Sequence, residues 1–196
     1  MKAILMFCIL MLSILGIHAQ YTPPDAAEIE QKALEKAREL GDLLKIIGNK
    51  RNDRNIRQNA KDMAMDMFDS DTNQIEVISK LTQTKRKYNI RDYLNHLESL
   101  EQYEDVKIEW KYIQTIEEIH QKPDGFWYGK LRIFQIFEGV AAGQSTRYKD
   151  ITEKDIEIKL NDQNINTGQK KMEKYFDLKF GNVAVYRLID ESDSKP

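Results

Sequence analysis

The chain has 196 residues, a single cysteine and nearly balanced charges, with 30 Lys and Arg against 32 Asp and Glu. A formal net charge of −2 creates no strong field that would attract nucleic acid or anionic lipid, so neither is expected as a partner. One cysteine excludes a disulfide framework and a cysteine metal site. The length fits one packed domain of roughly 100 to 200 residues.

The N-terminus has the organisation of a secretory signal peptide. A positive charge at the second position precedes an apolar stretch, Ala3–Ile17, and a small residue, Ala19, follows. The stretch is shorter than the roughly 20 residues that span a bilayer, and Cys8 lies inside it instead of after the cleavage point, where lipid would be attached. We therefore predict cleavage between Ala19 and Gln20. Residues 20–196 are then expected to be secreted or periplasmic, without a membrane anchor.

The next part of the chain has the apolar spacing of helices. Apolar residues return every three or four positions over Asp25–Ile47 and again over Arg54–Phe68, which predicts two amphipathic helices. Asn89 is expected to cap a third helix. Between the second and third helices, Ile75–Ser79 predicts a short strand and Lys80–Tyr88 a basic, solvated loop.

Strand patterns dominate the rest of the chain. Apolar residues alternate from Val106 to Tyr112 and change parity at Ile113, which predicts a β-bulge near these two residues. Pro123-Asp124-Gly125 predicts a turn between two strands. The remaining elements are expected to be strands at Phe126–Phe137 and Tyr148–Leu160, loops at Gly139–Ser145 and Asn161–Lys171, a hairpin turning at Gly181-Asn182, and a charged disordered tail at 190–196.

This order of helix, helix, short strand, helix and long strands resembles the nuclear transport factor 2-like superfamily. The segments that carry the resemblance span about Arg54–Leu188: MAMDMF, IEVIS, RDYLNHLESL, VKIEWKYIQTIEEI, FWYGKLRIFQIF, DITEKDIEIKL and YFDLKFGNVAVYRL. The resemblance implies one α+β domain over residues 20–189, with two to three N-terminal helices packed on a strongly curved antiparallel sheet. A secreted chain of this pattern is similar to uncharacterised exported members from bacteria of the Bacteroidetes type.

The resemblance leaves two functions open. Enzymes of this superfamily place an Asp or His and a Tyr donor in a pocket between the third helix and the sheet, whereas many relatives have no known activity. The first hypothesis is a binding or scaffold module for a small apolar ligand or a protein partner, with no catalytic motif and no cofactor. The alternative is a small isomerase, cyclase or dehydratase, for which Asp155 and Tyr112 are the candidates. A homodimer formed through the curved sheet is a third possibility.

Aromatic residues of the strands are candidates for lining such a pocket. These aromatic residues are expected to fill the core between sheet and helix; if the fold encloses a pocket, Trp110, Tyr112 and Tyr128 are the residues expected to line it. His96 and His120 are the available imidazoles for acid–base chemistry. His96 lies off the apolar stripe of its helix and His120 is at a strand end, so surface positions are expected for both.

No metal or nucleotide site is predicted. Asp69–Asn73 and Asp162–Asn166 have the acidic spacing of calcium loops but lack glycine at the sixth position, where Gln74 and Thr167 stand, so ordinary turns explain both. The Gly139–Ser145 segment lacks the spacing of a phosphate-binding loop.

Overall fold

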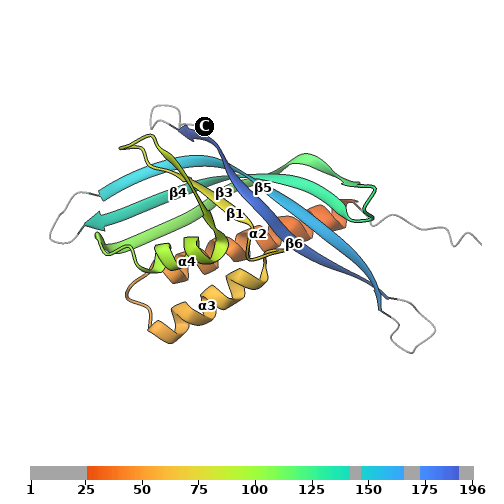
Figure 1. Cartoon of the computed structure of the whole chain (residues 1–196), viewed down its shortest axis with the longest axis horizontal. Coiled ribbons are helices and arrows are strands. Elements are labelled where there is room, and N and C mark those ends of the chain that lie inside the picture. Colours follow the sequence, from red (N-terminus) through yellow and green to blue (C-terminus); the bar gives the residue numbers. More distant parts are fainter. Residues whose placement is uncertain (1–25, 142–146, 166–172, 190–196) are drawn as a thin grey trace, which may run out of the picture.

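The computed structural model describes residues 26–141, 147–165 and 173–189. Over these ranges, three helices pack on a curved six-stranded sheet, which is the α+β architecture that the resemblance implied (Figure 1). The elements in chain order are α2 (Ala26–Gly48), α3 (Arg54–Asp66), β1 (Gln74–Ile78), β2 (Lys85–Asn89), α4 (Ile90–Glu98), β3 (Tyr103–Gln121), β4 (Trp127–Ala141), β5 (Arg147–Ile165) and β6 (Glu173–Ile189). The signal peptide and the tail at 190–196 lie outside the described residues and stay predictions.

The helices form where the sequence predicts them. The apolar stripe of α2 is buried along its whole length, from Ile29 to Ile47. The side chain of Asp53 caps α3 by accepting a hydrogen bond from the Asn55 amide at 2.7 Å. Asn89 caps α4 in the same way, accepting from the Asp92 amide at 2.8 Å, so the predicted cap is confirmed. None of the described helices is long and apolar enough to cross a membrane.

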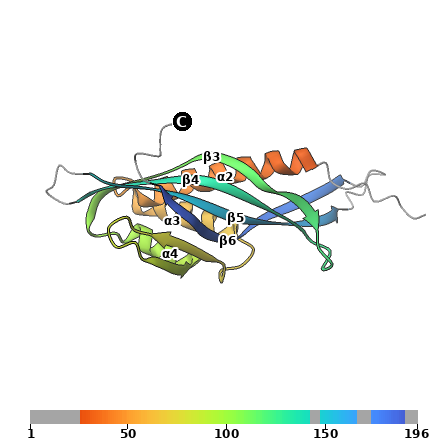
Figure 2. The same cartoon turned by 90° about the horizontal axis from the view of Figure 1, so that it is seen from above.

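The sheet has the strand order β2-β1-β6-β5-β4-β3. Its long strands are antiparallel neighbours, while β1 meets β6 in parallel through Ile75 and Val183. Figure 1 shows α2 running along the sheet, with α3 and α4 beside its C-terminal half. Viewed from above, the long strands twist along their length (Figure 2). The sheet therefore has a concave face that encloses helices and an outer face.

The predicted bulge lies in β3. Lys111 pairs with Phe134 and Gln114 with Arg132, so β3 holds one more residue than β4 at this point. Tyr112 lies in this bulge and has a positive φ of 50°, which accommodates the extra residue. The bulge reverses the parity of the strand, because Ile113 packs against the core while Tyr112 is 70% exposed.

Two predictions about the strands were wrong, one of a loop before the third helix and one of a hairpin turn near the C-terminus. Lys85–Asn89 is the strand β2, because the open edge of β1 offers it backbone hydrogen bonds from Gln74 to Ile78. Gly181-Asn182 is no hairpin turn but a bulge inside β6, where three steps from Phe180 to Val183 face two steps of β5. β4 continues to Ala141 and β5 to Ile165, past the starts of the loops predicted at Gly139 and Asn161; residues 142–146 and 166–172 lie outside the described ranges.

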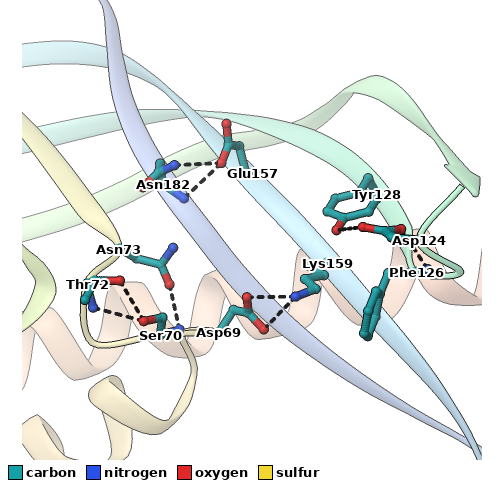
Figure 3. A network of polar contacts seen from close by, with 10 residues as sticks. All are labelled: Asp69, Ser70, Thr72, Asn73, Asp124, Phe126, Tyr128, Glu157, Lys159 and Asn182. Atoms are coloured by element: carbon teal, nitrogen blue, oxygen red, sulfur yellow. Dashed lines mark hydrogen bonds and ion pairs between the residues drawn. The ribbon is translucent and has the colours of Figure 1, made fainter. Parts of the chain in front are cut away.

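Polar contacts hold the bulge of β6 and the loop after α3 against the sheet (Figure 3). A carboxylate oxygen of Glu157 on β5 accepts from the backbone and the side-chain amide of Asn182, at 3.2 and 3.0 Å. The ammonium of Lys159 binds both carboxylate oxygens of Asp69 at 3.2 and 3.0 Å. The Ser70 amide donates to Asn73 Oδ1 at 2.7 Å, which closes the acidic segment as an ordinary turn.

Candidate functional site: a polar cavity between α4 and the sheet

A cavity of about 290 Å³ lies between α4 and the concave face of the sheet. Its volume is at the lower end of the roughly 300 to 1,000 Å³ that is typical of small-molecule sites. Tyr93, His96 and Leu97 of α4, with Leu100 just after the helix, form one wall, and strands β1 to β5 contribute the others. This is where the resemblance placed a pocket.

One strand contributes a row of four polar side chains to the cavity. Tyr148, Asp150, Thr152 and Lys154 occupy alternate positions of β5 and all line the cavity. Gln135 of β4 pairs with Thr152 and faces the same space. Acid, hydroxyl, amide and amine groups therefore meet on an otherwise apolar concave face.

Asp150 is the buried carboxylate of this stripe, with 7% of its surface exposed. Burial raises the pKa of Asp150, although the hydrogen bond from Tyr148 and the charge of Lys154 act in the opposite direction. A carboxyl group in this state gives up and takes back a proton closer to neutral pH than an exposed aspartate does. That property is required of a general acid or base.

Tyr148 fixes the orientation of Asp150. Its hydroxyl donates to Asp150 Oδ2 at 2.7 Å and accepts from the Lys80 amide at 3.0 Å, with Ser79 Oγ at 3.2 Å. Burial raises the pKa of Tyr148, so the hydroxyl remains protonated. Tyr148 is therefore engaged on both sides and acts as a positioning residue.

Lys154 crosses the cavity wall toward β1. Its side chain is 1% exposed, and its Nζ donates to the backbone carbonyl of Glu76 at 3.0 Å. Burial lowers the pKa of Lys154 to about 8, against the opposing charges of Asp150 and Glu76. The amine is therefore cationic at neutral pH but close to its titration point.

Two further hydroxyl groups have no partner among the described residues. Thr152 is 2% exposed and its Oγ1 makes no hydrogen bond there. The Tyr93 hydroxyl also lacks a hydrogen bond to another described residue, and burial followed by the charge of Asp150 raises its pKa. A buried hydroxyl group without a hydrogen-bond partner, such as that of Thr152, destabilises the fold. Both Thr152 and Tyr93 line the cavity.

The residues predicted from the sequence lie elsewhere. Tyr112 is exposed on the outer face, where its ring contacts Phe134 edge-on, because the bulge turns it away from the core. Asp155 has the outward parity of β5 and binds the guanidinium of Arg132 at 2.7 and 3.1 Å. Contrary to the prediction, Tyr112 and Asp155 therefore do not lie in the pocket.

The two other predicted pocket residues are also outside the cavity. Trp110 packs against the core and donates from Nε1 to Gln135 Oε1 at 3.2 Å, so it supports the cavity wall from behind. Tyr128 lies at the hairpin end, where its hydroxyl donates to Asp124 Oδ2 at 2.6 Å (Figure 3). This contact raises the pKa of Tyr128 to about 12.

The histidines have surface positions. His96 is exposed at the cavity mouth, and its ring stacks on Tyr88 with centroids 5.3 Å apart. His120 lies at the far end of β3, with Nδ1 3.8 Å from a Glu117 carboxylate oxygen. Over residues 26–141, 147–165 and 173–189, no three His, Cys, Asp or Glu side chains gather closely enough to hold a metal ion.

The parity of β5 was the signal that could have identified the site. Ile156, Ile158 and Leu160 alternate as buried positions, and the same parity continued toward the N-terminus passes through Lys154, Thr152 and Asp150. The candidate Asp155 has the opposite parity. Tyr93 carried no such signal, because a tyrosine on an apolar helix stripe is equally typical of a core.

The fold and the cavity together define an α+β protein with a buried carboxyl group in a cavity between α4 and the sheet. No family model matches the sequence, and no curated protein matches it. Among solved structures, the chain is similar to one from Novosphingobium aromaticivorans DSM 12444 whose name proposes a scytalone dehydratase. The two are 11% identical with a TM-score of 0.46, over 88% of this chain and 92% of that chain. A similarity at this level does not indicate which activity this chain has.

Proposed function

We propose that this protein is a small acid–base enzyme that moves a proton at a carbon next to a carbonyl group, leading to isomerisation or loss of water. This is the second of the two functions that the sequence left open, with Asp150 and Tyr93 in the roles first given to Asp155 and Tyr112. The observation that carries the proposal is the buried, oriented carboxylate of Asp150 in a ligand-sized cavity. Export of the domain stays the prediction made from its N-terminal sequence.

The proposed reaction begins with Asp150 as the base. Its carboxylate takes the proton from the carbon next to the carbonyl, and the electron pair of the broken C–H bond forms an enolate. Lys154 and Tyr93 line the same cavity and stabilise the negative charge on the enolate oxygen. Asp150 then returns the proton to another carbon, or gives it to a β-hydroxyl group that leaves as water.

Deuterium exchange tests the proton transfer without knowledge of the natural substrate. The protein is incubated with cyclohexanone in D₂O, and exchange beside the carbonyl is followed by NMR. Loss of water from 3-hydroxycyclohexanone is followed by the absorbance of the enone. Asp150→Asn is expected to reduce both rates about 100-fold or more, because the base is removed.

Asp155→Asn is the matched control, since it changes the same side-chain type on the same strand at an outward position. It is expected to keep the wild-type rates. The proposal fails if neither compound reacts, or if the two variants lower the rates equally.

A binding module without turnover is the second candidate. The observation that favours it is that the Tyr148 hydroxyl already donates to Asp150 and accepts from the Lys80 amide, so it is not free to donate a proton to a substrate. The apolar walls formed by Ile78, Leu97 and Ile108 suit a small apolar molecule. Binding of cyclohexanone without exchange would favour this function.

A further inference from the structure

We propose that Arg86 forms an anion subsite at the mouth of the cavity and that the ligand is a small amphipathic carboxylate. The inference rests on the proposal that the cavity is a ligand site. It adds the charge and the orientation of the ligand, which the acid–base groups do not determine.

The alternation of β2 separates its basic residues onto two faces. Lys85 and Lys87 point to one face, where they approach the Glu76 carboxylate at 4.0 and 3.2 Å. Arg86 lies opposite Val77 in the register of the β1–β2 pair and, like Val77, lines the cavity. The three consecutive basic residues therefore have different roles.

The charges on the outer face have partners within the protein. Despite partial burial, the pKa of Glu76 is lowered, because its carboxylate accepts a hydrogen bond from the Val185 amide and contacts Lys87 and Lys85, so it is ionised. Lys85 also donates to the Val185 carbonyl at 2.9 Å. Arg86, in contrast, has no acidic partner among the described residues.

The guanidinium of Arg86 is exposed at the rim, whereas Asp150 is buried inside. A carboxylate matches one guanidinium in charge and can accept two parallel hydrogen bonds from it. Asp150 repels a second negative charge, so the anionic end of a ligand stays at the rim and the neutral end enters. Between the two, Val77, Leu97 and Phe137 offer apolar surface.

A matched pair of probes tests the subsite in the full-length protein. Binding of 3-phenylpropanoate and of 3-phenylpropanamide, which differ in charge but hardly in shape, is measured by calorimetry at low ionic strength. We expect the carboxylate to bind wild-type protein about tenfold more tightly, which corresponds to about 1.4 kcal/mol. Arg86→Gln removes this preference and leaves the amide affinity unchanged.

Lys87→Gln is the control, because it removes a basic residue next to Arg86 from the opposite face of the strand. It is expected to keep the preference for the carboxylate. 2-Phenylethyl phosphate is the third probe, and tighter binding of the phosphate than of the carboxylate would overturn the carboxylate assignment.

Equal binding of carboxylate and amide to wild-type protein, or failure of all three probes to bind at millimolar concentration, would overturn the anion subsite. These outcomes are separate from the exchange experiment, which uses neutral ketones and does not depend on Arg86. A persisting preference in Asp150→Asn would show that the subsite works without the catalytic carboxylate.

Discussion

The polar residues inside the cavity lower the stability of the fold. Asp150, Thr152 and Lys154 occupy concave-face positions that Ile156 and Ile158 fill farther along the same strand. Burying a charge or an unpaired hydroxyl is unfavourable unless partners compensate for the lost water. Such groups are expected where binding or catalysis requires them, which is why they carry the functional proposal.

The lowered pKa of Lys154 makes stability depend on pH. The folded protein binds this proton less tightly than the unfolded chain, with a pKa of about 8 against about 10.4 when unfolded. The cost of burying the ammonium is therefore fully present below pH 8 and disappears as pH rises through the unfolded pKa.

Relative to Lys154→Met, the wild-type free energy of unfolding should rise by on the order of 3 kcal/mol between pH 8 and 10.5. Urea denaturation of both proteins across this range measures the change. Lys45→Met, at an exposed position of α2, is the control for the removal of a lysine. A free-energy difference between wild type and Lys154→Met that does not change with pH would contradict the buried-amine interpretation.

Thr152→Val separates the structural from the functional effect of a buried hydroxyl. The substitution keeps the shape and removes an oxygen without a described partner, so it should stabilise the fold by about 1 kcal/mol. It should also weaken binding of 3-phenylpropanamide, measured by calorimetry.

Thr115→Val is the matched comparison, because Thr115 also buries an unpartnered Oγ1 but does not line the cavity. It should stabilise the fold with unchanged ligand affinity. Equal affinities for both variants would argue against a ligand contact at Thr152.

Single-residue irregularities shape the strands. The bulge at Tyr112 reverses the two faces of β3, and the bulge at Gly181-Asn182 lets β6 continue past a sequence that is typical of a turn. An extra residue locally increases the twist and bend of a strand. The curvature of the concave face is therefore linked to positions where the alternation of the sequence is broken.

The turn between β3 and β4 depends on its glycine. Gly125 has a φ of +87°, and a Cβ added there would meet nothing within 4 Å. Gly125→Ala should therefore lower the free energy of unfolding by about 1 kcal/mol through the backbone alone. Thermal unfolding measures this decrease in stability. Gly125→Asn should destabilise the fold less than Gly125→Ala, because asparagine tolerates a positive φ better. Equal destabilisation by the two variants would contradict this explanation.

At the scale of the molecule, the cavity results from incomplete cover of the sheet. The 23-residue α2 packs along the sheet, whereas the nine-residue α4 meets it near the cavity. The β1–β2 pair closes the remaining side and contributes Val77, Arg86 and Tyr88 to the cavity lining. Residues from six elements therefore enclose the cavity, and no pair of these elements would form it without the others.

Much of the local structure can be predicted from the sequence. Helix boundaries, the Asn89 cap, the bulge at Tyr112 and the Pro-Asp-Gly turn depend on neighbouring residues, whose spacing and backbone preferences can be read directly. The α+β class follows from the order of these elements.

The pairing of strand edges and the set of side chains that share the cavity depend on how the whole chain packs. Lys85–Asn89 becomes a strand because β1 lies beside it, and Gly181-Asn182 stays in a strand because Glu157 binds Asn182 from the neighbouring strand. Asp150, Tyr93 and Arg86 are far apart in the sequence but line the same cavity, and local sequence patterns do not encode this arrangement. The physical reason is that burial and charge environment depend on the packing of the whole chain, while periodicity reports only the preference of each segment.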